Sequence, residues 1–144
     1  MARNFALAGL LGLRRLEENQ AASTLLAANR RHGALQARQG VLLRNLEASP
    51  VEVSSAAALR AAAISRASSR SMLTDLAALT AVSEADSAQA QGDYQQARAA
   101  TVGLEKLENK HASGLAAEDL RAEQLVLDEI ASGSWRRQKE SLPR

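Results

Sequence analysis

Residues of the kinds that carry chemistry are few in this 144-residue chain, and their spacing does not assemble a reaction centre. There is no cysteine, which excludes disulfides, thiolate metal sites and cysteine nucleophiles. The two histidines, His32 and His111, lie far apart and do not follow a metal-ligand spacing. The phosphate-binding glycine loop, the zinc-protease motif and the nucleophile elbow do not occur. We therefore expect a non-enzymatic protein without a cofactor or a metal.

Arginine doublets at positions 14–15, 30–31 and 136–137 are the candidate phosphate contacts. Single-strand binding also needs aromatic stacking groups, and the chain has only one Phe, one Tyr and one Trp. Residues 1–71 carry ten Arg and four acids, whereas residues 72–144 carry eight Arg or Lys and twelve acids. Opposite charges on the two halves favour pairing of one half with the other, and we expect no nucleic-acid partner.

The positions of the two prolines, Pro50 and Pro143, predict the elements that carry these residues. Proline ends a helix at or before the preceding residue, and nearly all other residues here are good helix formers. We predict a first helix over about 5–47, a Ser/Ala-rich connector over 48–72, a second helix over 73–132 and a frayed tail over 133–144. Ser54 or Ser55 is a candidate cap inside the connector, for which a disordered linker is the alternative, and Gly133 is a candidate helix stop.

Leucine and alanine at helical spacing with charged flanks are typical of a narrow helix–helix seam. The predicted fold class is all-α: a single domain formed by a long antiparallel two-helix coiled-coil hairpin. Facing positions whose residue numbers add to about 119 set Arg44 against Asp75, Leu46 against Leu73 and Leu25 against Tyr94. A tight reversal at Pro50 would instead set arginines against alanines. In the preferred register, the end of the second helix extends past the start of the first.

The apolar run over residues 5–13 is too short to span a bilayer and is best interpreted as the start of an amphipathic helix. A secreted protein that uses this run as a signal peptide is an alternative, although no small-residue cleavage site follows the run. A general coiled-coil scaffold or dimerisation module is a second alternative.

Several segments resemble the FliJ family of flagellar export proteins. The similarity to the family's C-terminal helix lies in 104–111 (LEKLENKH), 117–124 (AEDLRAEQ) and 127–131 (LDEIA). Segments 5–14 (FALAGLLGLR) and 21–26 (AASTLL) are similar to its first helix. Segment 112–117 (ASGLAA) carries less charge than is usual for the family. The resemblance covers nearly the whole chain.

The resemblance implies a cytoplasmic component of the flagellar type III export apparatus, peripheral at the cytoplasmic face of the inner membrane. Family members form an antiparallel coiled coil like the rotary stalk of ATP synthases. This coil sits inside a hexameric export ATPase ring, helps the ring assemble and couples it to the membrane export gate; some members also handle export chaperones. An injectisome ATPase stalk of similar shape is a further alternative.

The resemblance also directs attention to two sets of residues. Charged residues near the paired termini are the expected ATPase-ring contacts: Arg14, Arg15, Arg121, Asp128, Glu129, Arg136 and Arg137. Residues in the hairpin's far portion are the expected export-gate contacts: Gln39, Leu42, Leu43, Leu46, Leu73 and Leu76. The alternative for the second set is that all of its members belong to the seam between the helices.

Overall fold

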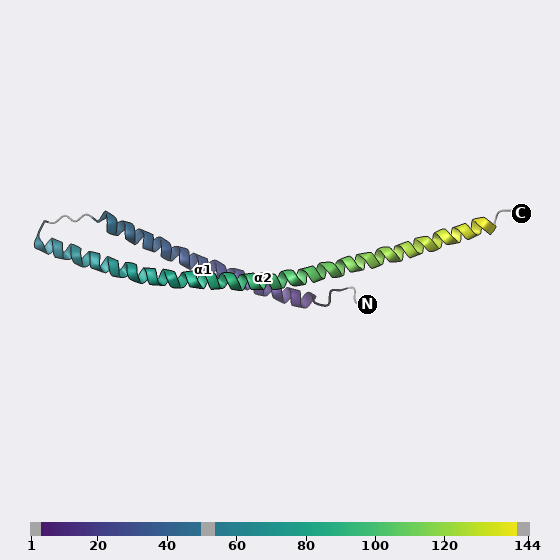
Figure 1. Ribbon diagram of the computed structural model, residues 1–144, viewed down its shortest axis with the longest axis horizontal. Helices are drawn as coiled ribbons and strands as arrows, with labels where there is room; N and C mark the ends of the chain where they lie inside the picture. The colour runs from purple at the N-terminus through teal and green to yellow at the C-terminus, as the bar shows by residue number, and fades with distance from the viewer. Residues whose placement is uncertain (1–3, 50–53, 141–144) are drawn as a thin grey trace. The chain divides into compact units, whose positions relative to one another are not determined.

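The computed structural model describes residues 4–49 and 54–140, with side chains described as far as Arg136, and it consists of two helices (Figure 1). Helix α1 spans Ala8–Ala48 and helix α2 spans Ala56–Glu140. No strand occurs among the described residues. The predicted all-α fold with two long helices packed against each other is confirmed.

Both ends of α1 have local causes. The helix stops at Ala48 because the ring of Pro50 disfavours helical geometry at Ser49, which agrees with the predicted end at residue 47. At the other end, the helix begins three residues later than predicted. The amide of Ala8 donates a hydrogen bond to the carbonyl of Phe5 (3.1 Å), and this turn precedes the first regular helical residue.

Helix α2 begins much earlier than the predicted position 73. Ser55 caps it, because its Oγ accepts a hydrogen bond from the amide of Ala58 (3.1 Å). Alanines dominate residues 56–63, and Ala has the highest helix propensity, so this segment continues the helix instead of forming a loose connector. The connection shrinks to residues 49–55, of which 50–53 lie outside the described residues. The guanidinium of Arg66 also donates to the carbonyl of Ser49 (3.2 Å).

The predicted stop at Gly133 does not occur, because α2 continues to Glu140. A glycine ends a helix by adopting a left-handed conformation, and no described glycine has a positive φ. The first eight residues of the predicted frayed tail are therefore helical, and residues 141–144 lie outside the described residues.

The contacts divide the chain into two compact units. The central unit is Arg15–Ala99, and the terminal unit combines Met1–Arg14 with Ala100–Arg144. In the central unit α1 and α2 lie side by side and antiparallel (Figure 1): Glu18 meets Arg98, Asn29 meets Ser87, and His32 meets Ser83.

The register differs from the predicted one by one helical turn. Numbers of contacting residues add to 116 for Glu18 with Arg98 and to 115 for His32 with Ser83, instead of about 119. A slip of one turn keeps the same face of each helix in the seam, so the apolar pattern alone does not choose between the two registers. The prediction relied on ion pairs such as Arg44 with Asp75, and exposed ion pairs contribute only about 0–1 kcal/mol.

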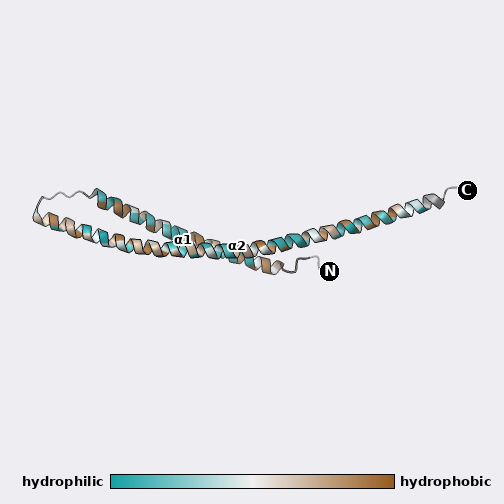
Figure 2. Cartoon of the chain, viewed as in Figure 1, coloured by the Kyte–Doolittle hydropathy of each residue, from teal (hydrophilic) through white to brown (hydrophobic). Residues whose placement is uncertain are grey.

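The seam between the helices is thin and is formed largely by small or polar residues. Among the described residues, the buried apolar side chains are Leu11, Leu76 and Ala90, and the buried polar ones are Ser83 and Thr101. Polar and apolar residues alternate closely along both helices (Figure 2). Within the described residues, neither helix contains an apolar stretch that could cross a membrane.

Candidate functional site: the exposed arm of α2

The most exposed part of the terminal unit is the stretch of α2 over residues 116–136, which we call the arm. Every residue of the arm is exposed except Gly133, which is half-buried. Six large apolar side chains of the arm are between 56% and 74% exposed: Leu120, Leu125, Val126, Leu127, Ile130 and Trp135. An isolated exposed leucine is ordinary, but six large exposed apolar side chains within sixteen residues make the arm the candidate interaction surface.

The charged residues that the family resemblance assigns to the ATPase ring lie mostly on this arm. Arg121, Asp128, Glu129 and Arg136 are all exposed. Arg137 belongs to α2, but its side chain lies outside the described side chains. Charged side chains of both signs therefore lie beside the apolar side chains of the arm. These charged groups keep the surface of the arm hydrated.

Arg14 and Arg15 lie elsewhere. Arg14 is half-buried in the terminal unit, and its carbonyl accepts a hydrogen bond from Thr101 Oγ1 (3.2 Å). Arg121 follows Thr101 by twenty residues, which is about 30 Å along a helix. Arg15 is exposed and belongs to the central unit. The structure therefore does not bring Arg14 next to the charged residues of the arm.

Five of the six candidate gate contacts occupy the seam of the central unit. Leu76 is buried, and four others are half-buried: Gln39, Leu42, Leu46 and Leu73. The sixth, Leu43, is exposed, as is the nearby Val41. Of this set, Leu43 is the residue whose side chain is most accessible to a partner.

His32 has a structural role in the central unit. Ser83 Oγ donates its proton to the carbonyl of Thr80 (2.8 Å), so it accepts a hydrogen bond from His32 Nδ1–H (3.0 Å). Beside this pair, Ser87 donates to the amide oxygen of Asn29. These polar contacts join α1 to α2 at the predicted seam position of His32.

His111 lies in the terminal unit, where its ring is half-buried and packs against Phe5 with the centroids 5.8 Å apart. Neither histidine belongs to a metal-binding cluster, because the described residues contain no group of three potential metal ligands.

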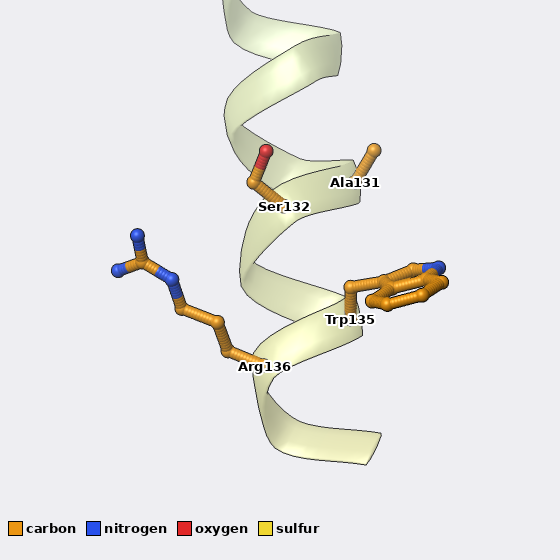
Figure 3. Close-up of a pocket in the computed structure, with 4 residues that line it drawn as sticks. All are labelled: Ala131, Ser132, Trp135 and Arg136. Atoms are coloured by element: carbon orange, nitrogen blue, oxygen red, sulfur yellow. The ribbon is translucent and has the colours of Figure 1, made fainter. Parts of the chain in front are cut away.

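The hollows on the arm are open surface features. One is lined by Ala131, Ser132, Trp135 and Arg136, and Figure 3 shows the Trp135 ring and the Arg136 guanidinium pointing away from each other around one helix. Small-molecule sites are concave and enclose most of the ligand's surface. A single helix surface offers no such enclosure, so the arm is better suited to a macromolecular partner.

Sequence reasoning selected the charged residues of the arm but not its exposed apolar residues. The spacing of Leu120, Leu127 and Ile130 follows a helical period and was available as a signal. It did not separate a seam from a partner surface, because both use the same residue types at the same spacing.

Comparison with known proteins identifies the family. The family described as "Flagellar FliJ protein" matches residues 3–140. Searches among curated proteins and among solved structures find no match. Because the family match covers nearly the whole chain, this protein belongs to the FliJ family and has a role related to flagellar protein export.

Proposed function

We propose that this protein is the non-enzymatic central stalk of the flagellar export ATPase. In this role the arm enters the hexameric ring, promotes its assembly and couples the ring to the membrane export gate. The observation that carries the proposal is the arm itself, a helical stretch over residues 116–136 in which every residue but Gly133 is exposed. Family membership supports the export setting in which such an arm would act.

The surface chemistry of the arm suits a ring interior. Exposed groups of both signs, including Arg121, Asp128 and Arg136, keep the surface wet and allow a partner to move over it. Leucines such as Leu120 and Leu127 supply apolar area at the same place. This combination favours a contact that is specific but reversible.

The central unit supplies the contact with the export gate in this proposal. Leu43 is its candidate residue, because it is exposed while the other candidate gate residues occupy the seam. A protein that joins a ring to a membrane gate works in the cytoplasm at the inner face of the inner membrane. Export chaperones are further candidate partners.

The first test mixes the purified protein with its cognate export ATPase and measures turnover and hexamer formation. We expect stimulated hydrolysis together with ring assembly. The double variant Arg121→Glu/Arg136→Glu should reduce the stimulation severalfold, because two exposed charges of the arm are reversed. The matched control is Arg60→Glu/Arg70→Glu, which reverses two exposed charges on α2 in the central unit. This control should stimulate the ATPase as strongly as the unmodified protein. A helical, folded protein without any effect on the ATPase would favour a general coiled-coil scaffold.

The gate contact has a test of its own. Leu43→Asp should weaken binding to the cytoplasmic part of the export gate while the circular dichroism of the hairpin is retained. Val41→Asp changes a similarly exposed residue in the same turn of α1 and serves as the control. Unfolding of the Leu43 variant would instead assign this residue to the seam.

A further inference from the structure

The arm carries two different lines of side chains. In the terminal unit α2 packs along positions spaced by three or four residues, all of them buried or half-buried: Thr101, Leu104, Glu108, His111 and Leu115. Continuing this line into the arm gives Glu118, Ala122, Leu125, Glu129 and Ser132. The continued line carries one large apolar residue, Leu125.

Three large apolar residues of the arm lie on a second line, which starts one residue later, at Ala116. This second line, which we call the stripe, contains Ala116, Leu120, Glu123, Leu127, Ile130 and Ser134. Residues of the stripe lie alternately one and two residues after those of the line that faces α1, so at about 100° per residue the stripe is turned by roughly 150° from that line. The stripe is therefore not a prolongation of the intramolecular seam.

The spacing and flanks of the stripe fit a second helix. Alternating steps of three and four residues are the coiled-coil repeat. The positions that flank the stripe are Ala117, Gln124 and Ala131 on one side and Asp119, Val126 and Gly133 on the other. Flanking charges normally select the partner of a coiled coil, and only one of these six residues is charged. Such flanks do not repel an identical copy of the arm.

The charge along the arm favours an antiparallel arrangement of two copies. Residues 116–129 hold five acids and one Arg, whereas residues 130–140 hold three Arg or Lys and one acid. Parallel pairing would set Glu123 against Glu123 of the second copy. Antiparallel pairing, with Leu120 opposite Ile130 and Leu127 opposite Glu123, separates the two Glu123 carboxylates and places Glu118 about one helical turn from the level of Arg136 of the second copy.

We propose that two copies of this protein associate through their arms as an antiparallel, two-fold symmetric pair. The two-fold axis passes midway between Glu123 and Leu127, and the flanking residue Val126 lies near it, beside Val126 of the second copy. Burying Glu123 against a leucine has a cost, so the pair is weak and separates readily. The proposed function places the same arm in the ATPase ring. Pairing and ring entry therefore exclude each other, and this one consequence rests on the proposed function.

The test is sedimentation of the full chain over a range of concentrations, without the ATPase. We expect a monomer–dimer equilibrium that Leu127→Asp abolishes. The matched control is Leu125→Asp, because Leu125 and Leu127 are 70% and 64% exposed but lie on different lines of the helix. Since both side chains are exposed, neither variant should change the circular dichroism. Glu123→Leu removes the buried charge and should tighten the pair by about tenfold or more.

The orientation has a separate readout, because the chain has no cysteine of its own. A single cysteine at position 126 should form disulfide-linked dimers on oxidation, whereas one at position 118 should not. A protein that stays monomeric even as Glu123→Leu overturns the proposal, and so does equal weakening by Leu125→Asp and Leu127→Asp. Neither result affects ATPase stimulation, so a failure of this inference is distinguishable from a failure of the stalk function.

Discussion

The central unit buries some of its apolar side chains between two helices, whereas the arm exposes all of its large ones. In the central unit, Ala90 and Ser83 are buried between the helices, while larger residues such as Leu79 and Val82 are exposed. In the arm, the large apolar residues are exposed and α1 does not cover them. Much of the chain's apolar area is thus exposed instead of being buried between the two helices.

Because few side chains are fully buried, the stability of the paired helices depends on a small number of contacts. Leu76 is the large apolar residue of the central unit that the described structure buries, and full burial of a leucine contributes about 1.5–3 kcal/mol. Each net hydrogen bond adds about 0.5–1.5 kcal/mol. Polar contacts such as that of His32 with Ser83 therefore contribute a stabilising free energy comparable to that of the apolar contacts. Substitutions made separately in the paired helices and in the arm test this difference in burial.

The largest expected effect is an all-or-none crosslink. Cysteines at positions 29 and 87 replace two side chains that contact each other across the central unit, so they should form a disulfide rapidly. Cysteines at positions 32 and 87 would face each other only if the helices slipped by one turn, and they should remain reduced. The readout is gel mobility with and without reductant. The opposite pattern would restore the predicted register.

The next effect compares two leucines. Leu76→Ala should lower the free energy of unfolding by about 2–3 kcal/mol, because it removes a side chain that is only 6% exposed. Leu127→Ala in the arm should change it by less than about 0.5 kcal/mol. Urea denaturation followed by circular dichroism, at a concentration at which the chain is monomeric, measures both. Equal losses would show that the arm is covered within the folded monomer.

A smaller effect is expected at Thr101, which is fully buried in the terminal unit. Thr101→Val removes the hydroxyl that donates to the carbonyl of Arg14 and should cost about 1 kcal/mol. Thr74→Val is the control, because Thr74 is exposed and its hydroxyl donates to the carbonyl of Arg70 within α2. The difference between the melting temperatures of the two variants measures the contribution of the inter-helix bond.

The smallest effect concerns the ion pair between Arg98 and Glu18 (3.1 Å). The Arg98 side chain is about half exposed, so screening limits the contribution of the pair to about 0–1 kcal/mol. Arg98→Ala should destabilise the protein slightly at low salt and hardly at all at high salt. A loss that is large and independent of salt would show that this pair, and not the small-residue seam, determines the register.

Much of the fold was predictable from individual residues. Pro50 located the end of α1, and Ser55 was among the candidate caps for the helix that follows. The early start of α2 and its passage through Gly133 were not predicted, because a helix started by a cap continues through Ser and Gly when no proline intervenes. In the candidate site, the charged residues of the arm were selected, whereas its exposed leucines were not.

The sequence by itself determined that the chain forms two helices and that their charges are opposite, because helix propensity, proline geometry and charge are local properties. Only the tertiary structure decided the register, since a slip of one turn keeps the same apolar face of each helix in the seam. The choice between the two registers depends on how hydroxyl-bearing residues such as Ser83, Ser87 and Thr101 contact the other helix. The tertiary structure also decided which leucines remain exposed. Helix α1 has 41 residues and α2 has 85, so the shorter helix covers only part of the longer one.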